Sequence, residues 1–195
     1  MIFRPGVRRK KTNVYGWKTT GMRAVYKNPW ISVREDRIIY PGGRRGIYGV
    51  VEKGPGVCIV PVTAIGQICL IRQYRYTIDA ECWELPAGAI HPGEGEKACA
   101  RRELFEEIGQ RARALRRLGN FYTALGHETA EIIVYLATGL SSAGHSLENQ
   151  ELDESILEVR QLSPAAVRKM IRENRINCGI SLAALNLFFL HNQKI

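Results

Sequence analysis

Four carboxylates and one guanidinium stand at fixed spacing in the middle of this 195-residue chain. They lie in the segment GAIHPGEGEKACARRELFEEIG, which runs from residue 88 to residue 109. Acidic side chains held close together are the usual ligands of hard divalent cations, and an arginine among them can orient their oxygens. These five residues are Glu94, Arg102, Glu103, Glu106 and Glu107.

The spacing within the segment predicts a helix. Ala100, Leu104 and Ile108 recur every four residues and form an apolar stripe. Glu103 and Glu107 are also four residues apart, so they share another helix face, where their like charges repel each other. Oxygen ligands converging on a cation such as Mg²⁺ would offset that repulsion. A solvated charged face is the alternative interpretation.

The segment resembles the Nudix box, G-x5-E-x7-R-E-U-x-E-E-x-G-U, in which U is a bulky aliphatic residue. Every specified residue is present, and the single departure is Gln110 at the last aliphatic position. The resemblance implies that Glu103 and Glu107 are the principal metal ligands, helped by the backbone carbonyl of Ala87. It also implies that Glu106 is a third carboxylate near the metal, which would be Mg²⁺ or alternatively Mn²⁺. Arg102 and Glu94 would then form a pair that orients the ligands, or a purely structural ion pair.

The flanking sequence is similar to the branch of Nudix proteins that includes the ADP-ribose pyrophosphatases. The similarity rests on LIRQYRY at residues 70–76 and on WELPAG at residues 83–88. It implies an α/β Nudix fold, in which a mixed β-sheet is sandwiched between helices and preceded by a small amino-terminal β-hairpin subdomain. In that branch the hairpin usually helps to form a homodimer, so a homodimer is expected here.

Four further residues outside the box are candidates for the site. Glu154, in an acidic loop with Glu151, could be the general base or a further metal ligand, although an exposed loop acid is the common alternative. Arg75 could hold the diphosphate, because a guanidinium suits phosphate geometry, or could be a surface arginine. Trp30 and Tyr48 could contact the base, and core or dimer packing would explain them equally well.

Composition limits the class of protein. The chain is 45% hydrophobic and 24% charged, as in an ordinary globular protein. No apolar run approaches the roughly 20 residues that span a bilayer, and the basic start MIFRPGVRRKK is not followed by the apolar region of a secretory signal. The five cysteines form neither a C-x-x-C metal pattern nor a disulfide framework. We therefore expect a reduced, cytoplasmic protein without a membrane partner.

The net charge of +9 is concentrated near the amino terminus, where residues 1–46 contain twelve Lys and Arg residues against two acids. A basic arm can be a soluble tail or partner contact, attract an anionic substrate, or bind nucleic acid. Nucleic acid is the least favoured of these, because no basic motif interleaved with aromatic residues is present.

Periodicity and turn residues divide the chain into three parts. Residues 1–20 form a basic tail that is expected to be poorly ordered. Residues 21–53 form the β subdomain, whose strands 31–40 and 46–52 make a hairpin, and residues 54–195 form the Nudix domain. Within that domain the runs 57–62 and 67–73 are expected to pair, followed by strands at 81–85, 115–122, 132–137 and 156–162. Ser163 and Pro164 should begin a helix, and 180–191 should form the last one.

The resemblance implies Mg²⁺-dependent hydrolysis of the diphosphate in a nucleoside diphosphate sugar, with ADP-ribose as the favoured substrate, giving AMP and ribose 5-phosphate. One alternative keeps the metal site and changes the substrate to GDP-mannose, a dinucleoside polyphosphate or a nucleoside triphosphate. Another is a non-catalytic module that senses a nucleotide or binds nucleic acid.

Overall fold

The computed structural model describes residues 13–143 and 155–192, and these divide into two compact units. The first unit contains the described residues up to Gly54 together with Tyr122–Glu131. The second contains Pro55–Phe121 and the described residues from Ile132 onward. The described residues contain no helix that is long and apolar enough to cross a membrane.

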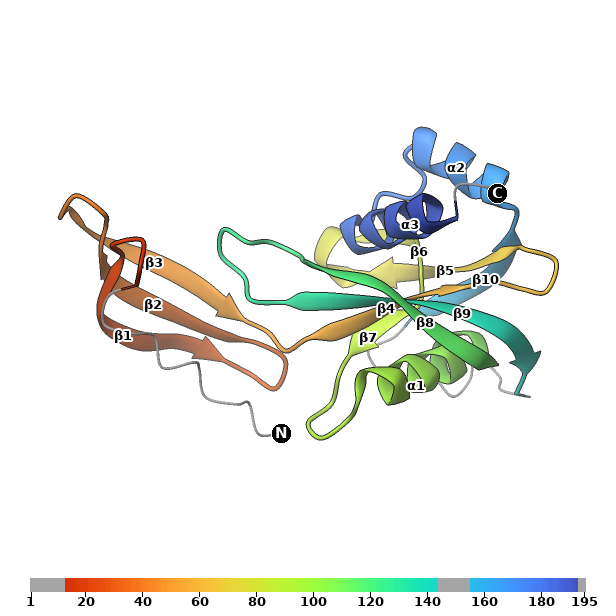
Figure 1. The fold of residues 1–195 in the computed structure, drawn as a ribbon, viewed down its shortest axis with the longest axis horizontal. Helices are drawn as coiled ribbons and strands as arrows, with labels where there is room; N and C mark the ends of the chain where they lie inside the picture. Colours follow the sequence, from red (N-terminus) through yellow and green to blue (C-terminus); the bar gives the residue numbers. More distant parts are fainter. Residues whose placement is uncertain (1–12, 144–154, 193–195) are drawn as a thin grey trace. The chain divides into compact units, whose positions relative to one another are not determined.

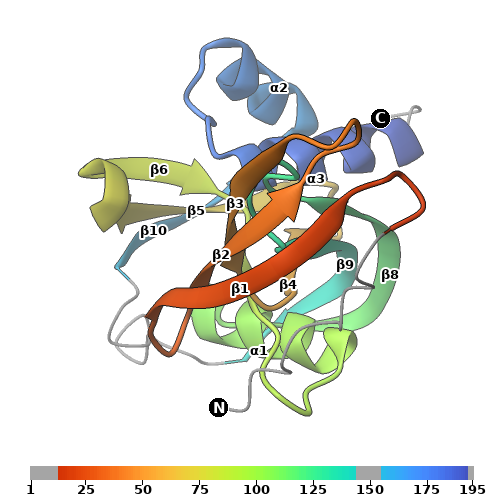
Figure 2. The same cartoon turned by 90° about the vertical axis from the view of Figure 1, so that its left-hand side faces the viewer.

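The first unit is built on a three-stranded antiparallel sheet in the order β1-β2-β3 (Figure 2). Its strands are β1 (Lys18–Lys27), β2 (Ser32–Ile39) and β3 (Arg45–Glu52). The predicted hairpin of β2 and β3 is confirmed, with Ser32 opposite Glu52 and Ile39 opposite Arg45. The remaining strand of this sheet, β1, was not predicted. It begins at Lys18, so the end of the segment expected to be poorly ordered is a strand paired with β2, and residues 1–12 lie outside the described residues.

The second unit contains two β-sheets, one of three strands and one of four. The four-stranded sheet, in the order β7-β4-β9-β8, contains β4 (Gly56–Pro61), β7 (Ala87–Ala89), β8 (Gln110–Tyr122) and β9 (Glu131–Ser142). It is mixed, because β4 runs parallel to β9 and antiparallel to β7. The other sheet, in the order β10-β5-β6, contains β5 (Ile68–Arg75), β6 (Ala80–Glu84) and β10 (Ile156–Leu162), with the short 3₁₀ helix η1 (Tyr76–Ile78) between β5 and β6.

Helices lie on both sides of these strands (Figure 1). One side carries α1 (Glu96–Ile108), and the other carries α2 (Pro164–Arg172) and α3 (Gly179–His191). The hydrophobic core is correspondingly divided. Leu104 of α1 packs in one cluster with Ile59 and Ile71, and Phe188 of α3 packs in the other with Leu70. This arrangement confirms the predicted α/β architecture.

The predicted pairing of the strands now identified as β4 and β5 is wrong. They belong to different sheets and are joined beside their turn by a single bridge between Val62 and Ile68. The strand β4 is buried along its whole length, and β5 is mostly buried as far as Gln73. A strand buried on two faces reads as a continuous apolar run, and such a run does not identify its neighbour.

The helix ends agree with the sequence signals. The Ser163 hydroxyl accepts a hydrogen bond from the Ala166 N–H at 3.2 Å, and Pro164 is the first residue of α2, as predicted. In the helix of the box, α1, the last turn ends at Gly109, which has a φ of +63° and whose N–H donates to the Phe105 carbonyl. Glycine is required there because the left-handed conformation is unfavourable for other residues.

Candidate active site

The site begins with the link between β6 and β7, where three consecutive residues are held by three different elements. The Leu85 N–H donates to the Ser181 hydroxyl of α3 at 2.9 Å. The Pro86 carbonyl accepts from the N–H of Ile59 in β4 at 2.8 Å. The Ala87 N–H donates to the Glu107 carboxylate of α1, also at 2.9 Å. This link therefore fixes the backbone of Ala87 against the helix that carries the acidic residues.

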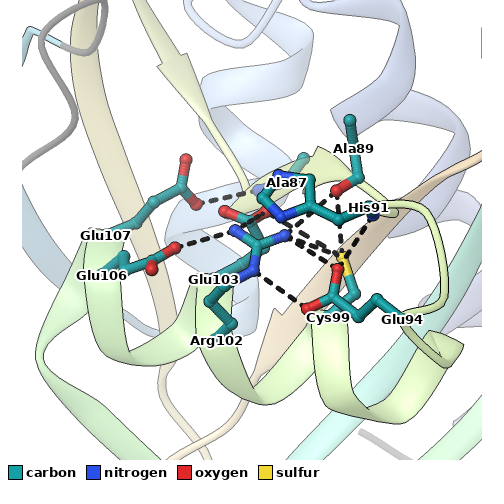
Figure 3. Close-up of polar contacts among 9 residues, drawn as sticks. All are labelled: Ala87, Ala89, His91, Glu94, Cys99, Arg102, Glu103, Glu106 and Glu107. Atoms are coloured by element: carbon teal, nitrogen blue, oxygen red, sulfur yellow. Dashed lines mark hydrogen bonds and ion pairs between the residues drawn. The ribbon is translucent and has the colours of Figure 1, made fainter. Parts of the chain in front are cut away.

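The two carboxylates predicted to bind metal are buried side by side on α1 (Figure 3). Glu103 and Glu107 are each only 2% exposed. Glycine at position 88 makes this possible, because a Cβ atom placed there would overlap the Glu103 carboxylate. A buried carboxylate must be compensated by hydrogen bonds or by a cation. The burial of two carboxylates four residues apart therefore marks this helix face as a charged site rather than a solvated surface.

Arg102 forms ion pairs with three of the acidic residues of the box, Glu94, Glu103 and Glu106 (Figure 3). Its Nε lies 3.0 Å from Glu94, and one terminal nitrogen lies 2.7 Å from Glu103 and 2.8 Å from Glu106. Its other terminal nitrogen donates to the Ala89 carbonyl at 3.0 Å. One guanidinium therefore connects three carboxylates of the box to the backbone of β7.

The protonation states follow from these contacts. The hydrogen bond from Arg102 lowers the pKa of Glu94, and partial burial of that carboxyl opposes the shift. The His91 N–H adds a further hydrogen bond to Glu94 at 3.0 Å. For Arg102, burial disfavours the charged form, but hydrogen bonds to Glu94 and Glu106 outweigh burial and raise its pKa. Glu94 and Arg102 therefore remain an ionised pair at neutral pH.

Sequence reasoning missed two residues of this cluster, Cys99 and Ala89. The Cys99 thiol donates to the Ala89 carbonyl at 3.4 Å and lies 3.4 Å from the guanidinium of Arg102. Burial raises the pKa of this thiol to about 12, so it remains protonated. The position of Cys99 one helical turn before Arg102 was the available signal, since residues three apart share a helix face.

A divalent cation fits these residues by their chemistry. The donors are carboxylate and carbonyl oxygens, which suit Mg²⁺, and the glycine at position 88 leaves the Glu103 carboxylate its space. The described residues contain no group of three or more His, Cys, Asp or Glu side chains arranged to hold one metal ion. Magnesium is commonly held by one or two carboxylates with water and substrate phosphates completing its shell, so a two-carboxylate site matches that usage.

The candidates outside the box are distributed differently. Arg75, at the end of β5, forms an ion pair with Glu84 at 2.6 Å. Tyr48 and Trp30 belong to the first unit, where the Tyr48 hydroxyl donates to the Gly126 carbonyl and Trp30 is exposed. Glu154 and Glu151 lie outside the described residues.

Comparison with known proteins agrees with the site and the fold. A family model for the NUDIX domain matches residues 52–178, and one for the nucleoside diphosphate sugar hydrolase N-terminal domain matches residues 17–51. The chain is 31% identical over 178 residues to the ADP-ribose pyrophosphatase of Mycobacterium tuberculosis, and the aligned region covers 91% of this chain and 84% of that protein. It is 28% identical over 160 residues to the ADP-ribose pyrophosphatase of Bacillus subtilis, and that aligned region covers 82% of this chain and 85% of that protein.

The fold also matches the crystal structure of an ADP compounds hydrolase with a TM-score of 0.81, at 20% identity over 91% of this chain and 95% of the other. The matched domain and the acidic cluster on α1 define a pyrophosphohydrolase. The chain belongs to the Nudix family, and within it to the branch of the ADP-ribose pyrophosphatases.

Proposed function

We propose that this enzyme hydrolyses the diphosphate of a nucleoside diphosphate sugar with Mg²⁺, or alternatively Mn²⁺, as cofactor, and that ADP-ribose is the substrate, giving AMP and ribose 5-phosphate. The observation that carries the proposal is the buried pair Glu103 and Glu107 beside the fixed backbone of Ala87. The amino-terminal match to nucleoside diphosphate sugar hydrolases and the names of the two curated relatives support the substrate class.

The reaction adds water to phosphorus while negative charge builds on the phosphate oxygens. A bound divalent cation supplies neutralisation of that charge and a lower pKa for the attacking water. In our proposal Glu103, Glu107 and the Ala87 carbonyl hold the cation, and Glu106 lies close to it. Arg102 and Glu94 position Glu103 and Glu106, an assignment that the contacts of the guanidinium support.

Three assignments outside the box complete the proposal. Glu154 would accept the proton of the attacking water or add a metal ligand. Arg75 would bind the diphosphate, and Trp30 and Tyr48 would contact the nucleotide. A homodimer formed through the first unit is also proposed, and the free cysteines support a reduced, cytoplasmic setting.

The decisive experiment replaces Glu107 with glutamine, which keeps an acceptor for the Ala87 N–H but removes the charge. Turnover of ADP-ribose should fall by at least about 100-fold, because a metal contributes several kcal/mol of transition-state stabilisation. The rise in melting temperature caused by Mg²⁺ should be lost as well. Glu96→Gln is the matched control, since Glu96 lies on the same helix but hydrogen bonds to Tyr135 instead. Full activity of the Glu107→Gln enzyme at saturating Mg²⁺ would exclude this metal site.

The substrate is tested by product analysis with a panel of ADP-ribose, GDP-mannose, UDP-glucose, diadenosine polyphosphates and nucleoside triphosphates. Preferential release of AMP from ADP-ribose is the expected result. Turnover of another member alone would keep the metal site and replace the substrate. Nucleotide binding without any turnover would favour a sensing module.

A further inference from the structure

The hairpin of β5 and β6 presents two separate sets of charged residues. Side chains alternate between the two faces of a strand, so Gln73 and Arg75 lie on one face of β5 and Arg72 lies on the other. Opposite them on β6, Glu84 shares the face of Arg75, and Glu81 shares the face of Arg72. The two sets therefore do not mix, although they come from the same pair of strands.

The set that contains Arg75 faces the side of the core that holds α1. Ile71 of that face packs in the same hydrophobic cluster as Leu104 and Cys99 of α1, whereas Leu70 and Trp83 of the opposite face pack toward α3. The hydrogen bonds to Glu84 raise the pKa of Arg75, and burial opposes that shift. Arg75 therefore lies on the face of β5 that packs toward α1, the helix that carries the proposed metal ligands.

The Glu84 carboxylate contacts the guanidinium of Arg75 side-on, along the edge formed by Nε and one terminal nitrogen. Arg75 Nε donates to one carboxylate oxygen at 3.0 Å, and one terminal nitrogen donates to the other at 2.6 Å. Two parallel hydrogen bonds of this kind fix the plane of a guanidinium as well as its position. Glu84 itself is only 4% exposed, and the amide of Gln73 donates to it at 3.4 Å.

The backbone behind Glu84 is equally constrained. The next residue, Leu85, donates its N–H to the Ser181 hydroxyl of α3.

The Arg75 side chain, by contrast, is 45% exposed. The side-on contact occupies Nε and one hydrogen of a terminal nitrogen, and a guanidinium has five N–H donors. The end of the guanidinium therefore keeps donors that point away from Glu84.

We infer that Glu84 is a positioning residue that orients Arg75 so that the free end of its guanidinium binds the substrate diphosphate. This inference rests on the proposed function, because it assigns a supporting residue to the phosphate contact of Arg75. Glu84 touches no substrate atom in this scheme and acts only through Arg75. A glutamine or a shorter acid at position 84 would leave Arg75 charged but without a fixed plane.

The test is a double-mutant cycle on the full-length enzyme, with KM and kcat measured for ADP-ribose. Glu84→Gln and Arg75→Ala should each raise KM by about 10- to 100-fold, the effect of losing a hydrogen bond between charged groups. The diphosphate is charged before reaction as well as in the transition state, so kcat should change much less than KM. The double variant should show no larger KM than Arg75→Ala alone, because Glu84 acts through Arg75.

Glu81→Gln is the matched control, because it breaks the ion pair between Glu81 and Arg72 on the opposite face of the same two strands. It should leave both kinetic constants unchanged. If Glu84→Gln does not fold, Glu84→Asp provides the second variant; it keeps the charge with a shorter reach and should give an intermediate KM.

The possible failures are distinguishable. Absence of turnover in the wild-type enzyme would overturn the proposed function, whereas a normal KM in Arg75→Ala would remove only its phosphate role and this inference with it. A raised KM in Arg75→Ala, combined with a normal KM in Glu84→Gln or with additive effects in the double variant, would overturn the role of Glu84 and leave the proposed function intact.

Discussion

Replacing Arg102 with methionine should destabilise the enzyme by about 3 kcal/mol, because three carboxylates would lose their common cation. Breaking a buried ion pair by removing one partner typically costs about 3–5 kcal/mol. The Arg102 side chain is 22% exposed and that of Glu103 is 3% exposed, so the Glu103 contact keeps most of this value. Glu94 and Glu106 are more accessible to water, and solvent screening places the total near the lower end of the range.

The assay is thermal unfolding without added metal. For a chain of this size, a loss of about 3 kcal/mol corresponds to a fall of roughly 6–12 °C in melting temperature. Arg72→Met is the matched control, since Arg72 also bridges two acids, Glu81 and Glu158, but does so on an accessible sheet face, where the loss should stay below about 1 kcal/mol. Adding Glu103→Gln to Arg102→Met should recover part of the loss. Equal shifts for Arg102→Met and Arg72→Met would refute the assignment of Arg102 as the compensating charge.

Three further predictions concern the glycine at position 88, Glu94 and the cysteines. Gly88→Ala should displace the Glu103 carboxylate, lower activity by at least about 100-fold and cost about 1–3 kcal/mol of stability. Gly95→Ala, whose added Cβ meets open space, should leave activity unchanged. The stabilisation contributed by Glu94 is the difference in unfolding free energy between the wild type and Glu94→Gln. It should be complete above the ordinary pKa of 4.5 and disappear as pH falls through the lowered pKa of the folded state. A constant difference down to acid pH would contradict this. A thiol reagent should modify Cys178 first, because the other four cysteines are buried, and Cys178→Ser should abolish the fast phase seen by mass spectrometry.

The placement of the box residues was largely predictable because they lie on one helix and the turn before it. The positions of Glu103 and Glu107 on a shared face follow from helical periodicity, and the capping of α2 follows from Ser163 and Pro164. Resemblance to the Nudix box then supplied the pairing of Arg102 with Glu94, which the structure shows at 3.0 Å. Short-range spacing is sufficient for such features because the backbone geometry between the residues is fixed.

Other features depend on partners that local patterns do not identify. The strand β1 is exposed along most of its length, so it lacks the alternation of buried and exposed residues that signals a half-buried strand. The strand β8 extends five residues further toward α1 than the predicted start at Leu115, through an arginine-rich stretch at the edge of its sheet. Charged residues are common on edge strands, where they prevent pairing with other chains. The contact of Glu84 with Arg75 was equally hidden, because it depends on the register of β6 against β5.

The backbone between β6 and β7 has a consequence for amide hydrogen exchange. Leu85 and Ala87 donate their N–H groups to α3 and α1, and the Pro86 carbonyl accepts from β4. The amides of Leu85 and Ala87 can exchange only when these contacts with the two helices are released, so their protection should approach that of global unfolding. The backbone of Ala87, which we propose as a metal ligand, should therefore belong to the slowest-exchanging unit of the domain. We therefore expect any local opening during turnover to involve segments other than this link.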